Sequence, residues 1–117
     1  MIMNKKSEIK ITVELDDNKM PAKIEWEATN AGFDGKKSAK TLMLSLWDEK
    51  ENVTLGIDLW TKEMTVDDMN AHYHQILLKM ADTFERATRN TEAANMIKDF
   101  SSEFGKKLDL KNNANRS

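Results

Sequence analysis

The side chains best suited to metal or acid–base chemistry in this sequence are its two histidines, His72 and His74. They fall in a stretch with helical periodicity, where residues two apart point about 200° away from each other and cannot bind one metal ion together. Asp68 stands four residues before His72, and such a pair supplies half of a metal or proton-transfer site. Nothing else at helical spacing completes it. We therefore expect a surface or interface position for His72 and assign no role to His74.

The remaining polar motifs give no active site either. Asp16-Asp17-Asn18 lacks the alternating ligands, central glycine and distant glutamate of a calcium-binding loop, and is typical of a turn. The serines have no nucleophile-elbow setting, and Gly32-Phe-Asp-Gly35 matches neither a phosphate-binding loop nor a dinucleotide fingerprint. There is no cysteine to supply a thiol nucleophile or a thiolate ligand. The sequence thus predicts no catalytic, cofactor-binding or metal-binding residue, and a protein that is not an enzyme.

The composition excludes two classes of partner, nucleic acid and the membrane interior. Eighteen basic and twenty acidic side chains give a formal charge of −2, which provides no general attraction to phosphate backbones, so nucleic acid is not expected. The sequence has no apolar run of the about 18 residues that a membrane span needs, and its first residues lack the apolar core of a signal peptide. We expect a cytoplasmic protein without direct membrane insertion.

The positions that such residues occupy depend on the strands and helices around them. Ile9 to Leu15 and Pro21 to Ala28 each alternate apolar and polar residues, which predicts an antiparallel hairpin around the Asp16 turn. A longer connection follows over residues 29–38, in which Phe33 is expected to return onto the body. Leu42 to Trp47 and Val53 to Trp60 alternate again and predict a second hairpin.

Two helices follow the strands. Thr65 stands at the N-cap position of a helix predicted over 66–88, and a break at 89–92 precedes a second helix that Asn90 or Thr91 caps. Gly105 is expected to end this helix, with the alternative that Leu108 and Leu110 belong to a frayed extension of it. The predicted fold is α+β: a four-stranded antiparallel sheet of two hairpins, followed by two C-terminal helices packed on one face. Residues 1–110 are expected to form a single domain, and 111–117 a disordered tail.

Three large apolar residues fall on the other face of the second hairpin. Met43, Trp47 and Trp60 have the opposite phase from the leucines that should face the helices, and the two indoles are expected to meet across the strand ends. Such a patch is typical of self-association or of a protein partner's contact surface. The alternative, which remains open, is that these are single exposed aromatics folded over the sheet rim.

Several segments resemble the GldC family of gliding-motility proteins. Asp58-Leu-Trp-Thr-Lys62 and Ala81-Asp-Thr-Phe-Glu-Arg86 are the most specific, and Pro21-Ala-Lys-Ile-Glu-Trp26, Met43-Leu-Ser-Leu-Trp-Asp48 and Ile9-Lys-Ile-Thr-Val13 lie in the same order along the chain. The resemblance implies a small accessory protein of bacterial surface gliding, a process tied to the type IX secretion system. It brings no catalytic residues with it.

The predicted order of elements is also similar to that of the export chaperone SecB, which assembles through its sheets. Three hypotheses follow. The first is a non-enzymatic interaction module of the gliding machinery that works as a homo-oligomer through Met43, Trp47 and Trp60. The second is a chaperone-like holder of unfolded secretion or motility clients, and the third, an enzyme, has no supporting constellation.

Overall fold

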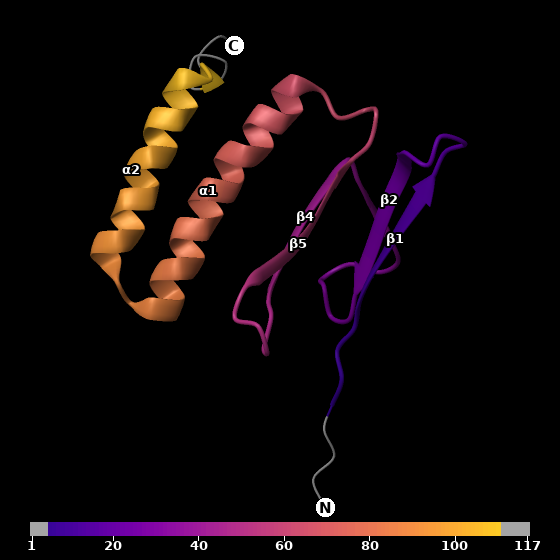
Figure 1. Cartoon of the computed structure of the whole chain (residues 1–117), viewed down its shortest axis with the longest axis horizontal. Coiled ribbons are helices and arrows are strands. Elements are labelled where there is room, and N and C mark those ends of the chain that lie inside the picture. Colours follow the sequence, from indigo (N-terminus) through magenta and orange to yellow (C-terminus); the bar gives the residue numbers. More distant parts are fainter. Residues whose placement is uncertain (1–4, 111–117) are drawn as a thin grey trace, which may run out of the picture. The chain divides into compact units, whose positions relative to one another are not determined.

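The computed structural model describes residues 5–110, which form five strands followed by two helices (Figure 1). The α+β class is confirmed. The chain forms two compact units that meet in sequence between Met64 and Thr65, with the strands in the first and the helices in the second. The expected single domain stays a prediction, and the expected tail, 111–117, lies outside the described residues. The elements are β1 (Ile9–Leu15), β2 (Pro21–Ala28), β3 (Lys37–Ala39), β4 (Thr41–Trp47), β5 (Thr54–Trp60), α1 (Val66–Thr88) and α2 (Thr91–Lys107).

The first hairpin follows the alternating pattern. β1 and β2 pair antiparallel, with Val13 opposite Ile24 and Ile11 opposite Trp26. Because directly opposed residues share a face, the apolar residues of both strands gather on one side, where Ile24 is buried. Phe33 packs edge-on against Trp26, with ring centroids 5.1 Å apart. The predicted return of Phe33 onto the body is confirmed.

Asp16 forms the turn between β1 and β2. Its Oδ1 accepts hydrogen bonds from the backbone N–H groups of Asn18, at 2.8 Å, and Met20, at 3.0 Å. Lys19 adopts a left-handed backbone with φ of 62°, which the tight turn requires. The turn predicted for this stretch is confirmed.

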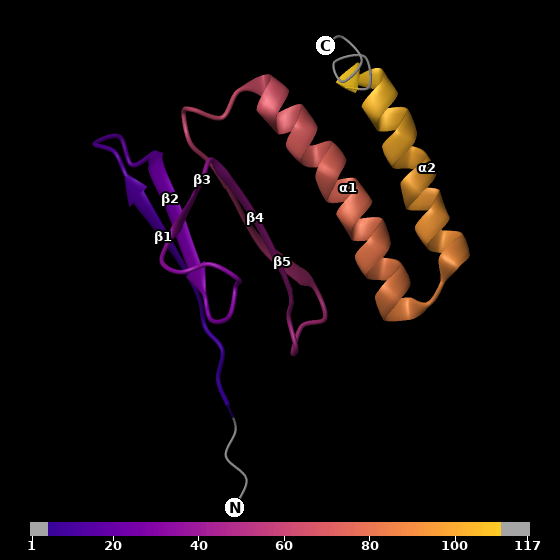
Figure 2. The ribbon, with the colours of Figure 1, turned by 180° about the vertical axis from the view of Figure 1, so that it is seen from behind.

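The prediction of one four-stranded sheet is wrong. β3, which lies at the end of the expected loop, pairs antiparallel with β2, with Ala39 opposite Ile24. The chain then bends at Lys40, and β4 pairs with β5 in a separate sheet (Figure 2). The strands form a three-stranded sheet in the order β1-β2-β3 and a two-stranded sheet β4-β5. A three-residue strand is too short to show an alternating pattern, so the sequence gives no sign of β3.

Thr61, the residue directly after β5, stabilises the bend at Lys40 between the two sheets. The backbone N–H and the hydroxyl of Thr61 both donate to the carbonyl oxygen of Lys40, at 2.8 and 3.1 Å. Thr61 is buried, so these bonds satisfy polar groups that water does not reach. The turn of the second hairpin is fixed by Asp48, whose carboxylate accepts from two backbone N–H groups at 2.7 and 3.1 Å.

Both helices have the caps that the sequence predicts. The hydroxyl of Thr65 accepts from the N–H of Asp68 at 3.0 Å, and α1 ends at Thr88 before a left-handed Arg89. Asn90 caps α2, because its Oδ1 accepts from the N–H of Ala93 at 2.9 Å. The short connection between the helices places them as an antiparallel hairpin (Figure 1).

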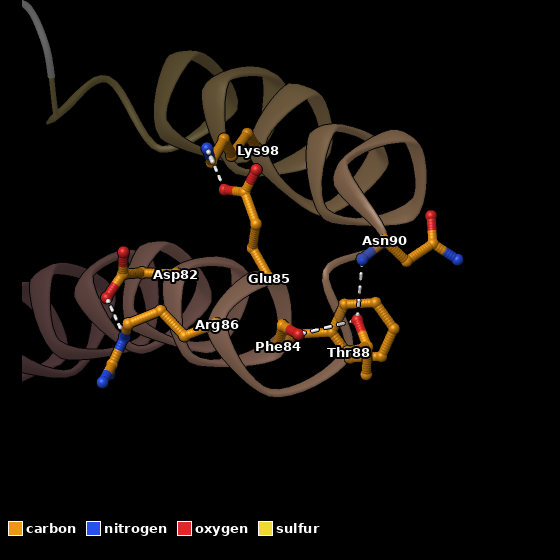
Figure 3. A network of polar contacts seen from close by, with 7 residues as sticks. All are labelled: Asp82, Phe84, Glu85, Arg86, Thr88, Asn90 and Lys98. Carbon is orange, nitrogen blue, oxygen red and sulfur yellow. Dashed lines mark hydrogen bonds and ion pairs between the residues drawn. The ribbon is translucent and has the colours of Figure 1, made fainter.

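Polar contacts join the two helices near their connection (Figure 3). Lys98 and Glu85 form an ion pair at 3.2 Å. The Thr88 hydroxyl donates to the carbonyl of Phe84 at 2.8 Å and accepts from the N–H of Asn90 at 3.1 Å. The ion pair with Lys98, together with a hydrogen bond from Thr91, lowers the pKa of Glu85.

Small residues line the contact between α1 and α2. Ala81, Ala94, Ser101 and Gly105 are all buried, and small side chains allow two helices to approach closely. The expected helix end at Gly105 is wrong, because α2 continues to Lys107. A Cβ atom at Gly105 would lie 2.8 Å from Nε2 of His74. The glycine therefore makes room for an imidazole of the neighbouring helix and does not serve as a left-handed cap.

Candidate protein-interaction surface

The register of the second hairpin places Met43, Trp47 and Trp60 on one face. Trp47 lies opposite Thr54 and Trp60 opposite Thr41, and residues two apart along a strand share its face. We call this surface the indole face. Its three large apolar side chains remain 39% (Met43), 67% (Trp47) and 57% (Trp60) exposed. Its eight residues are Thr41, Met43, Ser45, Trp47, Thr54, Gly56, Asp58 and Trp60.

The expectation that the two indoles meet across the strand ends is wrong. Trp60 pairs with Thr41, at the start of β4, whereas Trp47 is at the end of the same strand. At about 3.4 Å per residue, six residues separate the two ends of the face by roughly 20 Å. The sequence pattern identifies the face correctly, but the distance depends on the pairing register, which the turn at Asp48 sets.

β4 and β5 have similar sequences, a repeat that the alternating pattern does not reveal, and this repeat explains why the two indoles lie at opposite ends of the face. β4 reads Thr-Leu-Met-Leu-Ser-Leu-Trp and β5 reads Thr-Leu-Gly-Ile-Asp-Leu-Trp. The two strands are antiparallel, and their middle residues, Leu44 and Ile57, are paired. A local two-fold axis through this pair therefore relates the first residue of β4 to the first residue of β5, and so on along both strands. The repeat therefore places two Trp–Thr pairs at opposite ends of one face. Thr41 and Thr54 belong to this surface although periodicity alone does not single them out.

The opposite face of the same hairpin is aliphatic throughout. Leu46, Leu55 and Ile57 are each more than half exposed. We call this surface the leucine face, and the expectation that the helices cover it stays a prediction. Its residues are Leu42, Leu44, Leu46, Leu55, Ile57 and Leu59.

The helical hairpin has an apolar face of its own. Each helix has a stripe of large apolar residues about 100° around its axis from the stripe that contacts the other helix. Because the helices are antiparallel, these two stripes emerge on the same side of the hairpin. Four of their side chains are exposed: Tyr73, Met80 and Phe84 on α1, and Phe100 on α2. Met96 is exposed as well, but it lies on nearly the opposite side of α2 from the contact stripe.

The two histidines lie in different surroundings, as their spacing predicts. The His74 ring lies against Gly105, whereas the His72 ring makes an edge-on contact with Tyr73 at 6.2 Å between centroids. Nε2 of His72 is buried without a hydrogen-bond partner. Among the described residues, no group of three or more metal-ligating side chains lies together.

The polar groups of the strand unit serve mainly to join its parts. Asp16 and Lys62 form an ion pair at 3.1 Å, which ties the β1–β2 turn to the segment after β5. The hydrogen bond from the Met20 backbone, followed by that from Lys62, lowers the pKa of Asp16. An open hollow of about 430 Å³ beside the ends of β1 and β2 is lined in part by Glu8 and Lys10. These charged groups have structural partners or face open solvent.

Comparison with known families decides the affiliation. The family model described as gliding motility-associated protein GldC-like matches residues 21–110. The chain belongs to this GldC-like family. The matched range includes the whole indole face and both helices, and the predicted resemblance is confirmed. No curated protein and no solved structure gives a significant match.

Membership in the GldC-like family associates the chain with gliding motility. The family is an accessory family of motility and is not a known enzyme family. In the part of the chain that the structure describes, neither helix has the length and apolarity needed to cross a membrane.

Proposed function

We propose that this protein is a non-enzymatic, cytoplasmic interaction module that supports the gliding machinery and its type IX secretion apparatus. It works as a homo-oligomer and binds protein through the indole face. The observation that supports this best is the pair of Trp side chains, Trp47 and Trp60, both more than half exposed on one face of a hairpin. Large aromatic side chains are enriched among the residues that dominate binding energy in protein interfaces.

The β4–β5 hairpin also has a physical need for a partner. A two-stranded sheet is marginally stable in water unless other elements or molecules cover it. Each strand of this hairpin has one unpaired edge, and both faces present large apolar side chains. Covering the indole face would remove apolar area from water at about 25 cal/mol per Å². This burial favours association of the surface and opposes the entropy that association costs.

Replacement of Trp47 and Trp60 with Ser tests the proposal. We expect the variant to stay folded, because neither indole is buried, and to lose capture of motility proteins by the tagged chain in gliding cells. Met20→Ser is the matched control, since Met20 is an exposed apolar residue of the same unit outside the indole face. Crosslinking before purification identifies the partner. Unchanged capture and unchanged mass by light scattering in the Trp variant would reject the assignment.

A second candidate function is that of a chaperone-like holder, as in SecB. The observation that favours it is the number of exposed apolar surfaces, which include the flexible side chains Met80 and Met96 on the helices. A holder binds many unfolded clients with low specificity, whereas an interaction module binds one folded partner. Suppression of aggregation of several unrelated unfolded proteins by the purified chain would favour the holder. Failure to suppress it, with capture of one partner, favours the module.

A further inference from the structure

We infer that the indole face forms a closed symmetric dimer in which each indole packs against a threonine of a second copy of this chain. This inference rests on the proposed function, because it names the occupant of the same surface and the way in which it docks. It follows from the arrangement of large and small side chains at the four corners of the face.

Large and small side chains alternate around the four corners of the indole face. Trp47 and Thr54 form one end of the face, and Thr41 and Trp60 form the other, with the two Trp residues on different strands. The two indoles therefore occupy one diagonal and the two threonines occupy the other. The local two-fold axis through the Leu44–Ile57 pair relates the Trp–Thr pair at one end to the Trp–Thr pair at the other. Thr54 is exposed, whereas Thr41 is half-buried and its hydroxyl donates to the carbonyl of Leu59 at 2.8 Å.

A second copy has the complementary shape. We infer a packing in which the strands of the two copies stay aligned, as in most stacked sheets. The two-fold axis then lies between the faces and runs either along the strands or across them. An axis along the strands places Trp47 on Thr54 of the second copy and Trp60 on its Thr41. An axis across the strands places Trp47 on Thr41 and Trp60 on Thr54. Both axes exchange the diagonals, so every indole meets a small side chain and never another indole.

The centre of the face is compatible with the same contact. Asp58 is the one charged residue among the eight that make up the indole face. It meets Met43 of the second copy in one docking and Gly56 in the other, so the two carboxylates are never directly opposed. Ser45 and Gly56 are small and allow the faces to approach.

The expected interface is modest in size. Two exposed indoles contribute on the order of 300–400 Å² for each copy, so the dimer buries roughly 600–800 Å² in total. Stable complexes bury about 1,200–2,000 Å². We therefore expect a reversible dimer with a Kd in the micromolar range, which dissociates on dilution.

Two double variants of the full chain test the docking. Thr41→Trp with Thr54→Trp puts an indole at all four corners, and Trp47→Thr with Trp60→Thr puts a threonine at all four. If the face associated only through nonspecific hydrophobic contact, the variant with four indoles would self-associate more strongly than the wild type. The symmetric docking predicts the opposite, about 30-fold or greater loss of self-association by sedimentation equilibrium, because the large side chains collide. Mixing the two variants should restore a dimer with one copy of each, detected by native mass spectrometry.

The controls separate docking from folding and from the proposed function. Circular dichroism and amide NMR spectra check each variant, and Thr54→Lys, a single exposed substitution, gives a second test if the four-indole variant does not fold. Like that variant, Thr54→Lys should weaken the dimer. A wild-type chain that stays monomeric at 500 μM, far above a micromolar Kd, overturns the inference. So does a four-indole variant that associates as well as the wild type. A monomeric wild type also removes the homo-oligomer from the proposed function. Capture of a motility partner, which needs Trp47 and Trp60 of the dissociated chain, is measured separately in cells.

Discussion

The two hairpins that follow one another in this chain, β4–β5 and α1–α2, differ in where their cohesion lies. Between the helices, Ala81, Ala94, Ser101 and Gly105 are buried and hold the pair together from within. In the strand hairpin every residue keeps at least partial exposure. Its backbone pairing fixes the register, but its side chains point outward from both faces. The helical hairpin is built around an internal contact, whereas the strand hairpin presents its side chains to whatever covers it.

Overpacking of the helical contact should have the largest effect on stability. Ala94→Leu adds three carbon atoms where Ala94 is fully buried, and we expect a loss of about 3 kcal/mol in the free energy of unfolding. Asn95→Leu is the matched control, because Asn95 is exposed on the same helix and should change stability by less than about 0.5 kcal/mol. Urea denaturation measures both. Equal effects of the two changes would contradict an internally packed hairpin.

A double-mutant cycle sharpens the same point at a single contact. In the wild type, Gly105→Ala gains helix propensity but forces the His74 ring away, so the net effect should be close to zero or destabilising. In a His74→Ala background the ring is gone, and Gly105→Ala should stabilise the hairpin by about 1 kcal/mol. We expect a coupling energy of about 1–2 kcal/mol by thermal denaturation. Additive effects would show that the ring does not occupy the space above the glycine.

Removal of a helix cap should have a smaller effect. Thr65→Ala removes the hydroxyl that accepts from the Asp68 N–H, and we expect α1 to lose about 1 kcal/mol. Thr65→Ser keeps the acceptor and should restore most of this stability. Hydrogen exchange of the first-turn amides of α1 measures the change locally. No difference between the Ala and Ser variants would contradict a capping role.

The smallest effect is expected at the turn of the strand unit, and it depends on pH. The pKa of Asp16 is lowered in the folded chain, chiefly by the Met20 backbone hydrogen bond and then by Lys62. The folded state therefore binds protons less readily than the unfolded state, and the carboxylate contributes stability that is lost as the pH falls through its folded pKa. Asp16→Asn should be less stable than the wild type at pH 6 and equal to it at the acid end. Urea midpoints between pH 6 and pH 2 measure this, and parallel curves would contradict it.

The sequence predicted the elements best where the signal was local. Thr65 and Asn90 are caps with a side-chain oxygen in the right place, and the bounds of α1 followed from them. The face of Met43, Trp47 and Trp60 followed from the two-residue period of a strand. The prediction failed at β3, because a three-residue strand shows no period, and at Gly105, because the partner of a helical glycine lies on another element.

The sequence by itself determined four of the five strands and both helices, the family, and the side of the hairpin on which the indoles lie. These depend on local periodicity and on short motifs, both of which are read along the chain. Only the tertiary structure decided that the strands divide into two sheets at Lys40 and that Trp47 and Trp60 lie at opposite ends of one face. Strand pairing joins residues distant in sequence, and a shift in register moves every side chain relative to its neighbours.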